Sequence, residues 1–282
     1  MLLQSLLRPV LTPIMRGIFD PAQSVSAAWT PADLASLTAW FDPSDLSTMF
    51  QDAAGTTPVT AAGQPVGLIL DKSGNGHHAS QTTSTARPLF QIDGSGNCYL
   101  AFDGVDDYLS TSAIDLTGTD KVTVFGGNSS LGTSGIQIRT EFSANSDSTP
   151  GTFSISSPVA PISTWDYFQL NGTSRVDVDV VDAAYANPKT VVVSCEFDIS
   201  GSGVLTEIFP RINGVVPPLQ HRGVSAGTGN FGNHPLFIGS RAGSSYFFNG
   251  NIYSLIIGGE LYDAATVIEA ETWVADKTGV TL

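Results

Sequence analysis

Short apolar or alternating runs, each bounded by glycine, proline or asparagine, follow one another along most of this sequence. Examples are PVGLIL (65–70), KVTVFGG (121–127), TVVVSCEF (190–197) and NIYSLIIGG (251–259). Runs of this length and spacing indicate strands joined by turns, and the Asn-Gly pairs at 171–172 and 213–214 predict hairpins. Beyond residue 41, only residues 263–279 have the apolar spacing of a helix. We therefore predict an all-β protein, a jelly-roll-like antiparallel β-sandwich with a short C-terminal helix.

The predicted sandwich begins near residue 29 and continues to residue 282. Its start, WTPADLASL, places Thr30 as N-cap, Pro31 first and Asp33 third in a short helix. A strand containing Trp40 and Phe41 should follow and end at Asp42. The run RVDVDVVD (175–182) predicts a half-buried strand whose aspartate face lies in water and blocks edge pairing. A row of carboxylates for calcium is the alternative for this run.

Composition narrows the class of partner. Lys and Arg number 12 against 26 Asp and Glu, a net charge of -14, which repels phosphate backbones and argues against nucleic-acid binding. No uninterrupted apolar run approaches the ~18 residues of a membrane span. Cys98 and Cys195 are predicted to be small buried thiols, with one disulfide between them as the alternative.

Residues 1–28 form a separate segment in which large apolar residues come in pairs about four positions apart. This spacing predicts one apolar face, although Pro9 and Pro13 exclude a single straight helix. Prolines and arginines also interrupt the apolar stretch that an export signal requires. Apolar side chains of this number outside a domain are expected to be buried against another protein surface, so we predict that this segment is a docking arm. Its contact residues would be Leu2, Leu3, Leu6, Leu7, Val10, Leu11, Ile14, Ile18 and Phe19.

Several motifs occur in a fixed order: DKSGNGHHASQ (71–81), LAFDGVDDYL (100–109), RINGVV (211–216), LFIGSR (236–241) and FFNGNIYSLII (247–257). The ordered set resembles the concanavalin A-like lectin/glucanase superfamily, in its laminin-G-like branch. The segments at 37–59 and 269–282 resemble a narrower group, virion proteins of bacteriophages and prophages that carry this domain. The resemblance covers about residues 30–282, but no motif matches between roughly 110 and 200.

The DKSGNGHHASQ segment has the residue types of a phosphate or metal site. A phosphate loop would need its lysine after the glycines and a helix behind it, and zinc would need further ligands. We therefore predict a structural loop in which Gly74 and Gly76 take positive φ and Asp71 and Ser73 bond backbone amides. A ligand-contacting loop is the alternative.

Catalysis is not expected. The resemblance suggests comparison with the glucanase pattern of two glutamates around an aspartate on one strand, and the nearest match is EFDISG (196–201). Glu196 and Asp198 are present, but Ser200 and Gly201 stand where the second glutamate belongs. A retaining glycosidase needs both carboxylates, so we predict that the protein is not an enzyme and needs no cofactor.

Ligand binding is assigned to two other places. Laminin-G-like domains bind calcium through loop carboxylates, so the resemblance makes Asp106 and Asp107 the candidates for a cation. Arg241 and Tyr246, in SRAGSSYFFNG (240–250), combine an aromatic face with a polar group and are candidates for contacting a glycan. We expect Trp40, Trp165 and Trp273 to belong to the core.

The resemblance implies a non-enzymatic structural protein of the phage virion, a component that decorates or caps the head, collar or tail. The arm would anchor it to other virion proteins, and the domain would contact host-surface glycans. The alternative is a carbohydrate-binding lectin or adhesin that attaches to the host. Because the apolar stripe at 2–19 needs a cover, we also expect a homo-oligomer, with a trimer favoured.

Overall fold

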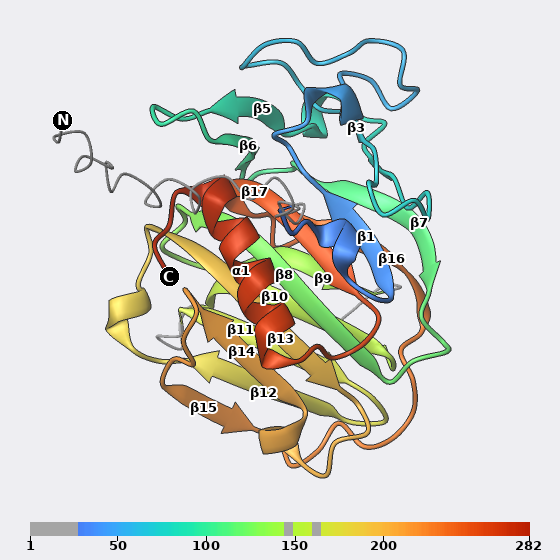
Figure 1. The fold of residues 1–282 in the computed structure, drawn as a ribbon, viewed down its shortest axis with the longest axis vertical. Coiled ribbons are helices and arrows are strands. Elements are labelled where there is room, and N and C mark those ends of the chain that lie inside the picture. Colours follow the sequence, from blue (N-terminus) through green and yellow to red (C-terminus); the bar gives the residue numbers. More distant parts are fainter. Residues whose placement is uncertain (1–27, 144–148, 160–164) are drawn as a thin grey trace, which may run out of the picture.

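The computed structural model describes residues 28–143, 149–159 and 165–282. These residues form two antiparallel sheets that face one another, with one α-helix on the outside of the first sheet (Figure 1). The predicted all-β sandwich with a short C-terminal helix is confirmed. The arm residues Leu2 to Phe19 lie outside the described part of the chain.

The first sheet has seven strands in the order β14-β13-β8-β17-β6-β5, with β1 pairing with β17. Its strands are β1 (Leu37–Phe41), β5 (Leu89–Ile92), β6 (Cys98–Asp103), β8 (Lys121–Ser130), β13 (Lys189–Asp198), β14 (Ile208–Ile212) and β17 (Asn249–Gly258).

The second sheet has ten strands in the order β15-β12-β11-β10-β9-β16-β7-β4-β3-β2. Its strands are β2 (Met49–Phe50), β3 (Leu68–Ile69), β4 (Ala79–Ser80), β7 (Leu109–Asp115), β9 (Ile136–Phe142), β10 (Thr152–Val159), β11 (Asp166–Asn171), β12 (Arg175–Val180), β15 (Leu219–Arg222) and β16 (Asn233–Ile238). Short 3-10 helices connect them: η1 (Pro31–Asp33), η2 (Leu46–Thr48), η3 (Ser84–Ala86), η4 (Ala183–Tyr185) and η5 (Val204–Thr206).

The main core lies between the sheets and is built from every second residue of each strand. Val191, Val193 and Phe197 of β13 point inward and are nearly inaccessible to solvent. Phe153 of β10 stacks on Phe197 across the gap with ring centroids 5.1 Å apart. Burying such aromatic side chains is a large favourable term in holding two sheets face to face.

A second core lies on the other face of the seven-stranded sheet, under α1 (Ala264–Thr278) (Figure 1). The helix begins where the Asp263 carboxylate accepts a hydrogen bond from Thr266 N at 2.8 Å, and it ends at Gly279, whose φ is 72°. Buried Glu271 fixes the helix to the sheet, because it accepts hydrogen bonds from Ser194 Oγ (2.6 Å) and Arg211 Nε (2.8 Å). No helix in the described part of the chain is long and apolar enough to cross a membrane.

The start of the domain follows the prediction. Thr30 caps η1, with Pro31 at its first position, and the Asp33 carboxylate accepts a hydrogen bond from Thr30 N at 2.7 Å. β1 ends at Phe41. Trp40 is buried in the helix-side core as expected, and the partly buried Trp273 packs against this core, edge-on to Trp40 with ring centroids 5.7 Å apart.

The loop at 71–81 has the hydrogen bonds and the backbone angles that we predicted. The buried Asp71 carboxylate accepts hydrogen bonds from the backbone N–H groups of Trp40 (2.9 Å), Ser73 (2.9 Å) and His77 (3.0 Å), and from Ser73 Oγ (2.6 Å). Gly74 and Gly76 have φ of 89° and 77°. The carboxylate therefore ties this loop to β1.

Two predictions about strands need correction. Asn171-Gly172 joins β11 to β12 as expected, but Asn213-Gly214 makes a turn that leads only to an isolated bridge between Ile212 and Val215. Two prolines, at 217 and 218, follow that turn and lack the N–H groups that a second strand would donate.

The aspartate face of β12 is not in water either. Asp179 is fully buried, and Arg222 of the neighbouring strand β15 lies 2.5 Å from its carboxylate. The valines Val176, Val178 and Val180 face the core as predicted, but β12 pairs along both edges. Arginine on the adjacent strand neutralises the carboxylate and permits the pairing that we expected it to block.

Both cysteines are free thiols. Cys195 is fully buried and Cys98 partly so, and in each case burial is the main cause that raises the thiol pKa. The prediction of small thiols rather than a disulfide is confirmed.

Candidate functional site

The four residues assigned to ligand binding lie on two neighbouring loops, each of which connects the two sheets. Residues 103–108 connect β6 to β7 and carry Asp106 and Asp107, whereas residues 239–248 connect β16 to β17 and carry Arg241 and Tyr246. Tyr108 joins the loops, since its ring lies 6.5 Å from the ring of Phe247 between centroids. We call these two segments the paired loops.

Gly243 is the point of closest approach between the paired loops. A Cβ added to Gly243 would lie 2.9 Å from the ring of Tyr108, so only glycine allows this contact. Its φ of 68° is also readily adopted only by glycine.

Arg241 and Tyr246 pair an anchored guanidinium with an exposed aromatic ring. The Arg241 guanidinium lies 4.9 Å from the centre of the Tyr246 ring, and its Nε donates to Glu141 Oε2 at 2.8 Å. The arginine is 13% exposed in its side chain, while Tyr246 is 40% exposed. The ion pair to Glu141 thus fixes the guanidinium, and the guanidinium supports one face of an accessible tyrosine ring.

The backbone of this loop is unusual. Ala242 and Tyr246 have φ of 48° and 53°, in the left-handed region that residues with a Cβ rarely occupy. A hydrogen bond from Arg241 N to Ser245 O at 2.8 Å closes the turn between them. Strained residues of this kind are common in binding loops, where the surrounding contacts hold a side chain in a set position.

The loop at 103–108 supplies carboxylates. Oxygen atoms of Asp103, Asp106 and Asp107 all lie within 4.8 Å of one another. Asp107 is buried and accepts a hydrogen bond from Asp103 N at 3.1 Å. Burial, with the neighbouring charge of Asp103, raises the pKa of Asp107 to about 6. An all-oxygen set of this type has the chemistry that calcium prefers, and it also offers acceptors to hydroxyl groups.

A row of side chains, polar except for the first, extends from the paired loops across the face of the ten-stranded sheet that points away from the core. Strand register places these residues side by side, one from each strand from β16 to β15: Phe237, Glu141, Ser154, Gln169, Asp177 and Arg222. The sequence did not reveal this row, because each member comes from a different strand and the pairings are long-range. Alternating polar residues in these strands were its only local signal.

The half-matched catalytic motif lies elsewhere. Glu196 and Asp198 are on β13, on the face of the seven-stranded sheet that carries α1. Glu196 accepts a hydrogen bond from Tyr262 N at 3.3 Å, and Asp198 pairs with Lys121 at 3.3 Å. These contacts are typical of residues that anchor neighbouring segments, and they lie on the α1 side of the seven-stranded sheet, outside the paired loops.

Together these features define an all-β, two-sheet sandwich with a polar outer face and an aromatic loop at its margin. No family model matches the chain, and no curated protein does. Solved structures do match: that of botulinum neurotoxin type C, reported with cell entry dependent on two ganglioside molecules, has a TM-score of 0.54 at 11% identity, over 85% of this chain and 51% of that one.

Two further matches have the same character. The binding domain of botulinum neurotoxin DC in complex with rat synaptotagmin II has a TM-score of 0.53 at 12% identity, over 87% of this chain and 52% of that one. Trypanosoma rangeli sialidase with the inhibitor DANA has a TM-score of 0.51 at 9% identity, over 86% and 33%. The chain therefore spans about half the length of the neurotoxin structures. The likeness shows a shared sandwich fold, while the concanavalin A-like and phage assignments stay predictions.

Proposed function

We propose that this protein is a non-enzymatic carbohydrate-binding domain whose site is formed by the paired loops. The observation that carries the proposal is the exposed ring of Tyr246, held in a left-handed backbone conformation over Arg241. A pyranose ring stacks on such an aromatic face through its C–H groups, and nearby charged groups bond its hydroxyls. Asp103 and Asp106, on the adjoining loop, supply acceptors for that purpose.

The structural likeness is consistent with this proposal. One of the matching neurotoxins is described with ganglioside molecules, which are glycolipids, and the matching sialidase with the inhibitor DANA. At 9–12% identity these matches support the fold, and the choice of ligand class rests on the paired loops of this chain.

A glycan array followed by calorimetry tests the proposal. We expect Tyr246→Ala to weaken the best ligand about tenfold or more, roughly 1.4 kcal/mol. Phe209→Ala is the matched control, because Phe209 is similarly exposed at 38% but lies on edge strand β14 of the other sheet. Equal binding by wild type and Tyr246→Ala would contradict the site.

We also propose that the domain does not hydrolyse polysaccharides. The basis is that Glu196 lacks a second glutamate two residues beyond Asp198 and faces Tyr262 rather than an open groove. We expect no reducing-sugar release from β-glucans. Release that disappears in Glu196→Gln would overturn this expectation.

A virion component is the second candidate function, and the apolar stripe at 2–19 favours it. In that case the arm joins the domain to other virion proteins as repeated copies, with a trimer as the expected oligomer. Changing Leu6, Leu7, Leu11 and Ile14 to serine should leave a folded domain that no longer joins particles. Light scattering of full-length and arm-deleted protein would test self-association, and a full-length monomer at micromolar concentration would count against it.

A further inference from the structure

Three charged side chains meet between the two sheets, where β11 and β13 begin and β8 ends. The Asp166 carboxylate accepts hydrogen bonds from Arg139 Nη2 and from Lys189 Nζ. All three side chains are at least nine-tenths buried, with exposures of 4% for Arg139, 0% for Asp166 and 9% for Lys189. Two positive groups therefore share one carboxylate away from water, which leaves a positive charge without an ionic partner.

The donors of Arg139 are only partly satisfied. Its Nε and Nη2 lie 3.3 and 3.1 Å from Ser130 Oγ, but Nη1 finds no acceptor among the described residues. The side-chain oxygen of Asn128 and the hydroxyl of Ser254 are also buried and lack hydrogen-bond partners within that part of the chain. A buried polar group left without a hydrogen-bond partner costs about 1–3 kcal/mol. The Ser254 hydroxyl lies on the α1 side of the sheet, but Arg139 Nη1 and Asn128 Oδ1 both face the space between the sheets and call for an explanation.

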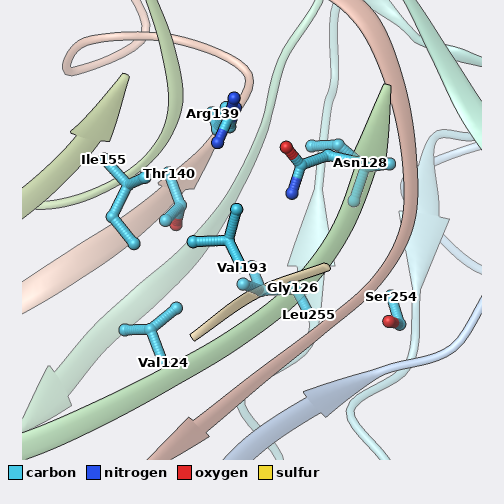
Figure 2. A pocket seen from close by; sticks show the side chains of 10 residues that line it. Val124, Gly126, Asn128, Arg139, Thr140, Ile155, Val193, Ser254 and Leu255 are labelled. Carbon is cyan, nitrogen blue, oxygen red and sulfur yellow. The ribbon is translucent and has the colours of Figure 1, made fainter. Parts of the chain in front are cut away.

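The side chains of Arg139 and Asn128 line the same cavity between the sheets, and Ser254 contributes its backbone to the wall (Figure 2). Its volume of about 20 Å³ is enough for one particle of the size of a water molecule. Figure 2 shows the Asn128 amide projecting into this space from β8, with Arg139 across from it and Val193 below. The cavity thus presents polar groups to a small guest on one side and apolar walls on the other.

Charge distinguishes the two kinds of guest that fit. A water molecule would accept a hydrogen bond from Arg139 but would leave the excess positive charge uncompensated. A small anion would accept that hydrogen bond and also compensate the charge. Asn128 can turn its NH2 group toward the anion, because the two ends of an amide exchange by rotation. Consistent with an excess of positive charge, burial and the charge of Arg139 lower the pKa of Lys189, against the opposing effect of Asp166.

We propose that the cavity binds one small monovalent anion of the size of chloride, held by Arg139 Nη1 and the Asn128 amide. The site is distinct from the surface of the paired loops, although the backbone at Arg139 is bonded to one of them: Gly239 N donates to Arg139 O at 2.9 Å and Ile138 N to Tyr246 O at 2.8 Å. The anion would stabilise the folded domain by mass action, since the unfolded chain has no such site.

Thermal unfolding of the full chain in sodium bromide and in sodium gluconate, at equal ionic strength, tests the proposal. We expect bromide to raise Tm by about 4 °C along a saturable curve. Lys189→Met removes the excess charge and keeps the Arg139–Asp166 pair, so it should abolish the bromide effect. Lys121→Met is the matched control, because Lys121 pairs at the surface with Asp120 and Asp198 and should leave the effect intact.

Anomalous diffraction from crystals grown in bromide gives a readout that does not depend on any variant folding. A bromide peak in the cavity, between Arg139 and Asn128, would support the proposal. Density for a water molecule alone, or a Tm that is the same in bromide and gluconate, would overturn it. A bromide effect on Tm that persists in Lys189→Met would also overturn it.

Discussion

The neighbouring glycines Gly126 and Gly127 of β8 face opposite sides of the seven-stranded sheet and should respond to alanine in opposite ways. A Cβ at Gly127 would lie 2.5 Å from Thr278 Cγ2 and 3.1 Å from Val274 Cγ1, both on α1. A Cβ at Gly126 would meet its nearest atom at 3.6 Å, an ordinary van der Waals distance. The methyl group of alanine at position 127 would therefore clash with α1, whereas that of alanine at position 126 would project into the cavity between the sheets.

The magnitudes follow from these distances. Overpacking a well-packed contact costs roughly 1–3 kcal/mol, and replacing glycine by alanine restricts the unfolded chain, which recovers about 0.4–1 kcal/mol. We expect Gly127→Ala to destabilise the domain by about 1.5 kcal/mol and Gly126→Ala to stabilise it by about 0.5 kcal/mol. For a domain of this size the two variants should differ in Tm by roughly 4–8 °C.

Differential scanning calorimetry at one pH would measure the difference. Thr278→Ser removes the methyl group that clashes and keeps the hydroxyl, which donates to Ala275 O at 3.1 Å. Added to Gly127→Ala, it should therefore recover most of the lost stability, a coupling that a double-mutant cycle would report. If Gly127→Ala melts at the wild-type temperature, or if Thr278→Ser restores nothing, the close packing of α1 on β8 is not as described.

Two further predictions concern carboxylates. Asp71→Ala should lower the free energy of unfolding by about 4 kcal/mol, because three backbone N–H groups lose their acceptor, one of them in buried β1. Chemical denaturation would measure this loss, and a loss no larger than that of Asp52→Ala, in a solvent-accessible loop, would contradict the reasoning. Burial raises the pKa of Glu196 in the folded protein. As the pH rises above the ordinary glutamate value, the unfolded chain therefore loses this proton before the folded protein does, and the wild type loses stability. Glu196→Gln should therefore match the wild-type Tm near pH 4 and exceed it near pH 7.5, and an equal difference at both pH values would count against this cause.

Local sequence signals predicted most of the strands and several turns. The alternation of Val176, Val178 and Val180 indicated β12, and the Asn171-Gly172 pair indicated the hairpin before it. Glycines in the 71–81 loop marked positive φ, which depends only on the residue itself. These features could be predicted because each is determined within a few residues of chain.

Features that depend on distant partners could not be predicted in this way. Asp179 is buried because Arg222 stands beside it on β15, and nothing near Asp179 in sequence shows that neighbour. The cluster of Arg139, Asp166 and Lys189 joins three strands from both sheets. The sequence did single out Arg241 and Tyr246, but their contact, and the packing of the two loops through Tyr108, required the structure.

The pairing of β1 with β17 has a consequence for how the chain folds during synthesis. Residues 37–41 can pair with β17 only after residues 255–258 have been made, and Trp40 is covered only once α1 has formed. The seven-stranded sheet therefore cannot close at β1 before residues up to about 278 have left the ribosome. Until then the first strand and its indole stay exposed and open to wrong pairings. We would expect a chain that ends before residue 264 to be cleared or to aggregate, even though it contains every strand of both sheets.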